Sequence, residues 1–352
     1  MAGLARGLER QELRVETGQL SQVVPPPATN PMPAREPALR SGAAYPLSTV
    51  ADPHTSLAKV RELTEAPRMR TLYPRAALAT GRSALARIPG VPIGGGEREL
   101  PDTELRLRGA EVERDRLAEY DRVCGFSPRD TLPPTYPHIL AFPLSMQIMT
   151  GSDFPFPVVG MVHLRNRIRQ RRAIGAGERL DLRVWTEELR PHDRGSQFEI
   201  RAEAAVAGEP AWESWSTYLY RHGGGGSGGK RPAHRGAEPL PPQASWKLPG
   251  DVGRAYAGVS GDSNPIHMHA LSARLFGMPR AIAHGMWLKA RCLAALEEHL
   301  PEALEADVSF KLPVHIPGTV SFASWPAGEG HDFAVHDSEN ERPHLTGSVR
   351  PA

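Results

Sequence analysis

A carboxylate and an imidazole stand five positions apart in the second half of the chain, at Asp262 and His267, with Asn264 and Pro265 between them. Proline interrupts a helix and favours an extended conformation at the residue before it, so the backbone must turn between the two side chains. A turn can bring both side chains to one point. A carboxylate beside an imidazole is a common pair for binding and polarising a single water molecule.

A second motif, Ile-Ala-His-Gly-Met at residues 282–286, begins a long apolar stretch with the character of a helix. The N–H of Gly285 then belongs to the first turn, where amides have no partner within the helix. Such an amide, together with the helix dipole, favours negative charge that develops on an oxygen atom. One donor of this kind is typically worth about 3–4 kcal/mol in a transition state.

Each of these residues alone also has a structural interpretation. Asp262 suits a turn or a helix cap, and His267 suits a partly buried histidine with satisfied hydrogen bonds. The complete string is harder to explain by turn chemistry, because the types and the order of its residues all fit one site.

Residues 256–267 read Tyr-x3-Ser-Gly-Asp-x-Asn-Pro-x-His. With the motif at 282–286, this string resembles the hydratase motif of the MaoC-like enzymes. Residues 310–318 resemble the strand and turn that follow in that family, and the likeness extends from Trp246 to about Val349. The resemblance implies a hot-dog fold and reversible syn addition of water to a trans-2-enoyl thioester, with no metal and no organic cofactor.

The resemblance also implies a role for each motif residue. Asp262 and His267 become the catalytic pair that binds the water, Asn264 helps to position that water, and the Gly285 amide receives the thioester oxygen. Four further residues are expected to support the site or contact the substrate: Ser260, Tyr256, His284 and Met286.

The first half of the chain repeats this pattern in altered form. Tyr120-x3-Cys124-Gly125-Phe126 matches residues 256–262, which indicates two copies of one structural unit. Phe126 stands where the acid would be, and no Asn-Pro-x-His follows, so we expect this half to be non-catalytic. Residues 132–138 and 154–156 resemble the N-terminal halves of double hot-dog 3-hydroxyacyl-thioester dehydratases of actinobacteria, in which the degenerate half is thought to widen the acyl pocket. His138, at a helix start, is expected to be structural rather than catalytic.

Four arginines alternate with other residues between positions 165 and 171, which places them on one face of a strand. Arg165 and Arg167 are candidates for binding the phosphates of coenzyme A or the arm of an acyl carrier protein. The alternative, which we favour for the arginine face as a whole, is a solvated outer face of the sheet.

The resemblance and the duplicated pattern together imply an α+β architecture, a double hot-dog with two long central helices, each wrapped by an antiparallel β-sheet. The two sheets are expected to join edge to edge, giving a monomeric pseudo-dimer or a homodimer of it. The predicted helices are Ser56–Leu63, Ala110–Val123, Pro133–Met149, Val252–Ala257, Ala270–Phe276 and Ile282–His299. The predicted strands are Val159–Arg172, Leu180–Leu189, Ser196–Val206, Trp212–Tyr220, Val308–Leu312, Thr319–Trp325, Asp332–His336 and His344–Val349.

Composition suggests four segments. Residues 1–48 are proline-rich and poor in aromatics, which predicts a disordered or loosely attached segment. Met69 offers an alternative start. Residues 49–221 form the degenerate domain, 222–243 a Gly/Pro-rich linker, and 244–352 the catalytic domain.

The remaining features mainly exclude functions. A net charge of +2 gives no reason to expect a nucleic-acid partner. Two isolated cysteines suit a reducing cytoplasm, and neither a membrane span nor a secretory signal is evident. His267 and His269 lack the further ligands and spacing of a zinc site, so no metal is expected.

The expected substrate is therefore an acyl-CoA or acyl-carrier-protein thioester. Three alternatives remain open: a thioesterase of the same fold, a non-catalytic module that binds acyl thioesters, and a dehydratase for small branched or dicarboxylic thioesters.

Overall fold

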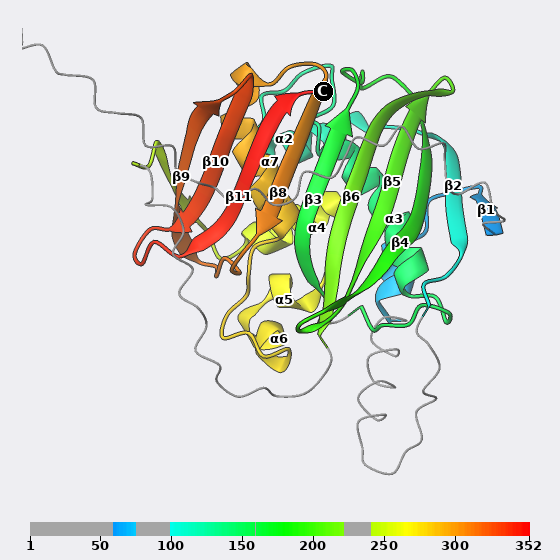
Figure 1. Ribbon diagram of the computed structural model, residues 1–352, viewed down its shortest axis with the longest axis horizontal. Coiled ribbons are helices and arrows are strands. Elements are labelled where there is room, and N and C mark those ends of the chain that lie inside the picture. Colours follow the sequence, from blue (N-terminus) through cyan, green and yellow to red (C-terminus); the bar gives the residue numbers. More distant parts are fainter. Residues whose placement is uncertain (1–58, 75–98, 159, 222–240) are drawn as a thin grey trace, which may run out of the picture. The chain divides into compact units, whose positions relative to one another are not determined.

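The computed structural model describes residues 59–74, 99–158, 160–221 and 241–352, which form one large sheet and a set of helices (Figure 1). The strands of the first half are β1 (Lys59–Leu63), β2 (Thr103–Ala110), β3 (Val162–Gln170), β4 (Leu180–His192), β5 (Gly195–Val206) and β6 (Glu209–Arg221). Those of the second half are β7 (Ala244–Leu248), β8 (Leu304–Phe310), β9 (Gly318–Ala327), β10 (Gly330–Asp337) and β11 (Pro343–Pro351). The helices are α2 (Arg114–Cys124), α3 (Tyr136–Met149), α4 (Val252–Ser260), α5 (Pro265–Met268), α6 (Ala270–Leu275) and α7 (Gly285–Ala295).

The order of the strands shows two copies of one unit. The sheet runs β1-β2-β4-β5-β6-β3-β8-β11-β10-β9-β7. Apart from β1, the order β2-β4-β5-β6-β3 in the first half mirrors β7-β9-β10-β11-β8 in the second. The halves join where β3 and β8 pair antiparallel, from Arg165–Ser309 to Gln170–Leu304. The expected edge-to-edge junction of the two sheets is therefore confirmed.

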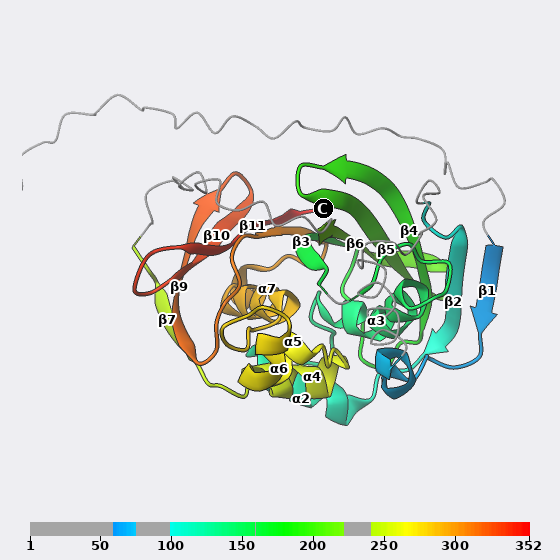
Figure 2. The same ribbon diagram turned by 90° about the horizontal axis from the view of Figure 1, so that it is seen from below.

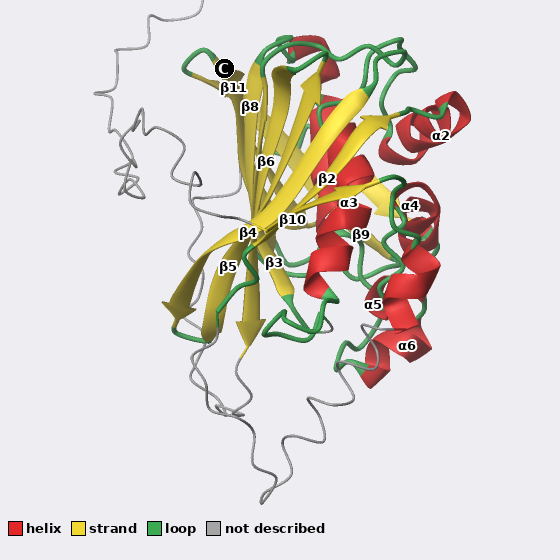
Figure 3. Cartoon of the chain, turned by 90° about the vertical axis from the view of Figure 1, so that its right-hand side faces the viewer, coloured by secondary structure: helices red, strands yellow, loops and turns green. Residues whose placement is uncertain are grey.

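The sheet curves around α3 in the first half and α7 in the second (Figure 2). All labelled helices lie on the same side of the sheet (Figure 3). Helix α3 is apolar around its whole circumference and almost entirely buried, as a helix at the centre of a wrapped sheet must be. The predicted double hot-dog fold is confirmed.

The helices that precede the central ones also correspond. Helix α2 ends at Gly125 with φ +85°, and α4 ends at Gly261 with φ +79°. Both angles lie in the left-handed region, which glycine adopts without steric cost. The next residue is the buried Phe126 in the first half and Asp262 in the second. The sequence similarity between residues 120–126 and 256–262 therefore corresponds to the same turn in both halves. Only the second half has an acid after the glycine.

One predicted helix is wrong. Residues 59–63 of the expected helix Ser56–Leu63 form strand β1, which pairs in parallel with β2 from Lys59–Thr103 to Leu63–Leu107. The open edge of β2 offers backbone partners that the local sequence cannot reveal, and such tertiary pairing overrides weak helical spacing. The other predicted helices and strands are present with shifted ends. Strands β2 and β7 were not predicted.

Several predictions fall outside the described residues, namely the segment 1–48 and linker residues 222–240. The proposed domain limits therefore stay predictions. Within the described part of the chain, no helix is both long and apolar enough to cross a membrane.

A buried lysine connects the two halves at their junction. Lys289 on α7 is fully buried, and its Nζ donates to Asn166 O at 3.0 Å, to Asn166 Oδ1 at 2.7 Å and to Ala306 O at 2.9 Å. Asn166 belongs to β3 and in turn donates to the hydroxyls of Ser214 and Ser216 on β6. One side chain of the second half thus satisfies acceptors on both central strands.

We predict that Lys289→Met lowers the free energy of unfolding by about 2–4 kcal/mol, because it leaves buried acceptors without donors. Chemical denaturation measures this change. Lys247→Met, on the exposed side of β7, is the matched control and should change stability by less than about 0.5 kcal/mol. Equal stability of the two variants would contradict the role given to Lys289.

Candidate active site

The turn between α4 and α5 brings the predicted acid and imidazole together. Asp262 follows Gly261, the C-cap residue of α4, Asn264 has an extended conformation, and Pro265 begins α5. One oxygen or nitrogen atom from each of Asp262, His267 and His284 lies within 4.8 Å of the others. The sequence spacing predicted convergence of the first two, and the structure adds the His284 ring to them.

A single hydrogen bond fixes the tautomer of His267. Its Nδ1 lies 2.8 Å from the carbonyl oxygen of Ile282, and a carbonyl oxygen can only accept. The proton of the neutral ring is therefore on Nδ1, and Nε2 carries a free electron pair. Burial lowers the pKa of His267 below its usual value, while the nearby Asp262 charge opposes that shift in part. The ring is neutral at physiological pH and can accept a proton.

The Asp262 carboxylate is held by neighbouring donors. Its Oδ1 accepts from the backbone N–H of Asn264 at 3.2 Å and from the Tyr73 hydroxyl at 3.0 Å, and its own N–H donates to Ser260 Oγ at 3.1 Å. Burial would raise the pKa of Asp262. The attraction of the His284 and His267 rings, which acts whenever either ring is protonated, and the hydrogen bonds donated by Tyr73 and the Asn264 N–H together hold that pKa below the usual value. The group is therefore charged beside a neutral imidazole.

His284 contacts both members of the pair. Its Nε2 donates to the backbone carbonyl of Asp262 at 2.8 Å, and its ring stacks on His267 with centroids 3.7 Å apart. Burial lowers its pKa to about 3, so the ring is neutral. Two imidazoles and a carboxylate, the set formed by His267, His284 and Asp262, are also a common set of metal ligands in proteins. The sequence analysis considered only His267 and His269 for a metal and did not predict this set. Here His284 Nε2 carries its proton toward the Asp262 carbonyl.

Gly285 is the first residue of α7, directly after the ring that touches Asp262 and His267. A Cβ at this position would lie 3.0–3.2 Å from the Phe310 ring, so glycine lets the helix start close to β8 without displacing that ring. Its amide belongs to the first turn, whose N–H groups lack partners within the helix. The position suits a donor to a substrate oxygen.

The other motif residues support this arrangement. Asn264 Oδ1 accepts from Ile266 N–H at 3.4 Å, so its side chain caps α5. Tyr256 is buried, and its ring centroid lies 5.0 Å from that of His284. Met286 is buried on α7. Any direct contact of Asn264 with water stays a prediction.

The first half supplies aromatic side chains next to the site. The His163 ring stacks on Tyr218 at 4.5 Å and lies 4.9 Å from Phe310. His138 on α3 is buried, which lowers its pKa to about 4, and it is close enough to Asp262 for that charge to act on it. His163 and Tyr218, like Tyr73, were missed because they come from distant segments and carry no motif.

Arg165 and Arg167 lie on β3 within an ion-paired sheet face. Arg165 contacts Asp307 on the neighbouring β8, and the Arg167 guanidinium lies 3.9 Å from the centre of the Trp215 ring. These partners favour the interpretation as an outer sheet face, and phosphate binding by the two arginines stays a prediction.

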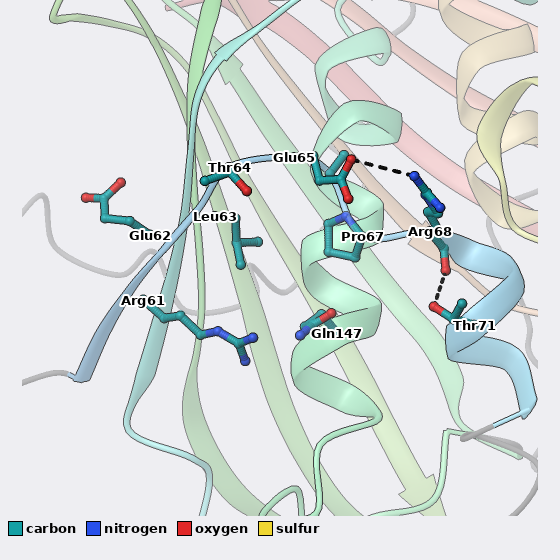
Figure 4. Close-up of a pocket in the computed structure, with 10 residues that line it drawn as sticks. Arg61, Glu62, Leu63, Thr64, Glu65, Pro67, Arg68, Thr71 and Gln147 are labelled. Atoms are coloured by element: carbon teal, nitrogen blue, oxygen red, sulfur yellow. Dashed lines mark hydrogen bonds and ion pairs between the residues drawn. The ribbon is translucent and has the colours of Figure 1, made fainter.

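A cavity of about 410 Å³ opens beside helical residues 69–74, the segment that carries Tyr73 (Figure 4). It is lined by residues 61–68, Thr71 and Gln147 of α3. None of the predicted site residues is among them, so this cavity is separate from the acid–imidazole pair.

Comparisons with known proteins identify the family of this chain. A family model described as "MaoC like domain" matches residues 240–346. The 3-hydroxyacyl-thioester dehydratase X of Mycobacterium tuberculosis is 34% identical over 271 residues, 76% of this chain and 95% of that protein. A crystal structure of HtdX from the same organism has 33% identity and a TM-score of 0.64, covering 71% of this chain and 100% of that one. A MaoC-like dehydratase from Phytophthora capsici has 18% identity and a TM-score of 0.59, covering 73% and 97%, which shows likeness of fold alone.

We predict that kcat/KM for hydration is level between about pH 6.5 and 8 and falls only below that range. His267 must be neutral to accept a proton, and its pKa is lowered from the ordinary 6.5. Activity is therefore lost as the pH falls through that lowered value, and the more acidic Asp262 protonates later. Initial rates in buffers of constant ionic strength test this. An acid limb with its midpoint above about pH 7 would contradict it.

Proposed function

Because the chain belongs to the family of MaoC-like dehydratases and is a hydro-lyase, we propose that it interconverts (3R)-hydroxyacyl thioesters and trans-2-enoyl thioesters. The observation that carries this proposal is the convergence of Asp262 and His267, with the Nδ1–H of His267 donated to the Ile282 carbonyl so that its Nε2 is left without a proton. The Asp262 carboxylate and His267 Nε2 can both accept a hydrogen bond from one water molecule, and the pair can transfer one proton to or from the substrate.

In dehydration the pair removes the C2 proton and delivers a proton to the leaving 3-hydroxyl. The C2–H and C3–O bonds break, the C2–C3 double bond forms, and one water leaves. Hydration reverses these steps with a water held by Asp262 and His267. Because one pair on one side of the substrate serves both carbons, addition and elimination are syn.

The Gly285 amide completes the mechanism. Loss of the C2 proton places negative charge on the thioester oxygen, and we assign the first-turn N–H of α7 to stabilise the charge there. Asn264 is assigned to orient the water, and Ser260 to hold the Asp262 backbone.

The substrate is an acyl thioester, and we propose coenzyme A or an acyl carrier protein as its carrier. No organic cofactor and no metal is required by the chemistry. The duplicated fold corresponds to two hot-dog units in one chain, so a monomeric pseudo-dimer or its homodimer is proposed. The free, buried thiols of Cys124 and Cys292 suit the cytoplasm as the proposed location.

We predict that Asp262→Asn lowers kcat for hydration by at least about 10³-fold while the protein stays folded, because the amide cannot exchange the proton. The measurement is loss of enoyl absorbance with crotonyl-CoA, alongside thermal unfolding. Asp193→Asn, in the exposed turn between β4 and β5, is the matched control and should retain full activity.

A series from crotonyl-CoA to dodecenoyl-CoA, with chiral analysis of the product, extends this assay. We expect a (3R)-hydroxyacyl product and no free thiol. Release of thiol without loss of enoyl absorbance would identify a thioesterase instead. Tight binding without turnover would identify a non-catalytic module, and full activity of Asp262→Asn would remove the assigned acid.

A further inference from the structure

Tyr73 reaches the catalytic acid from a segment far upstream of every motif. Its hydroxyl donates to Asp262 Oδ1 at 3.0 Å and lies 3.4 Å from the Gly261 carbonyl oxygen. The two residues that form the shorter bond are 189 positions apart in the sequence. The contact therefore depends on the docking of helical residues 69–74 against the turn that carries Asp262.

That docking is secured on both sides of Tyr73. Leu72 is buried in the core with only 1% of its surface exposed. The Met69 side chain lies against Gly261, 3.2 Å from the place that a Cβ there would take. The tyrosine is thus fixed in position by apolar contacts that do not involve its hydroxyl.

The two carboxylate oxygens of Asp262 have different surroundings. Oδ1 accepts from both Tyr73 and the Asn264 backbone N–H, whereas Oδ2 has His284 Nε2 at 3.8 Å, too far for a hydrogen bond. With Oδ1 occupied, Oδ2 is the oxygen left to share a water with His267.

We propose that Tyr73 is a positioning residue for the dehydratase reaction, which orients the Asp262 carboxylate so that Oδ2 faces the reacting water. This inference rests on the proposed function and assigns a reaction role to the segment that precedes the first hot-dog unit. Tyr73 acts through Asp262 and does not itself exchange a proton with the substrate.

The Tyr73 hydroxyl stays protonated and can therefore donate to Asp262 throughout the reaction. Burial, followed by the charge of Asp262, raises the pKa of Tyr73 well above its usual value. The hydroxyl therefore remains a neutral donor at every pH at which the enzyme works. A donated hydrogen bond also stabilises the charged carboxylate, so its loss should make Asp262 less acidic.

We predict that Tyr73→Phe lowers kcat for crotonyl-CoA hydration by about 10-fold or more and changes KM by less than about 3-fold. A hydrogen bond to a charged group is worth about 1.5–3 kcal/mol, which corresponds to at least a tenfold change in rate. The matched control is Tyr136→Phe. The Tyr136 hydroxyl is buried without a partner among the described residues, so its removal tests loss of a hydroxyl alone. Wild-type kcat in Tyr73→Phe would overturn the inference, as would an equal loss in both variants.

A second measurement does not depend on turnover. In protein labelled with ¹³C at the aspartate carboxyl carbon, the Asp262 resonance is identified by its absence in Asp262→Asn. We expect its titration midpoint to move upward by about one pH unit in Tyr73→Phe and not in Tyr136→Phe. An unchanged midpoint would overturn the inference.

The two proposals can fail separately. A wild-type protein without hydratase activity defeats the proposed function, and the NMR titration still decides whether Tyr73 holds the carboxylate. An active wild type with an unaffected Tyr73→Phe variant defeats only the role of Tyr73.

Discussion

The hydrogen bond from His267 Nδ1 to the Ile282 carbonyl is the constraint on which the site depends. It places the ring proton away from Asp262 and leaves Nε2 as the basic atom. Burial keeps that ring neutral, whereas the surrounding donors keep the carboxylate charged. The protein thus holds two proton acceptors of different strength around one point, which a single water can bridge.

The two halves of the duplicated fold contribute differently to the position of Asp262 and His267. Each half ends a helix with a left-handed glycine, but only the second places an acid after it. The first half instead contributes strand β3, the aromatic residues near Asp262 and the acceptors of Lys289. With Phe126 in place of an acid, that half contributes to packing and to the surroundings of the site in the second half.

Much of this was predictable from local sequence. The long apolar helices, the duplicated pattern and the turn across Pro265 are encoded in short segments, and the structure contains all three. Residues 59–63 were mistaken for a helix because their partner strand lies about 40 positions away. Tyr73 and the Lys289 network depend on contacts between distant segments, which neither spacing nor periodicity records.

The central claim is that Asp262 and His267 act as one unit on one water. A double-mutant cycle on kcat/KM, with Asp262→Asn, His267→Gln and the double variant, tests this most directly. If the pair acts as a unit, the double variant should be no slower than the slower single variant. Losses that multiply, so that the double variant is slower by the product of the two single effects, would contradict a shared water.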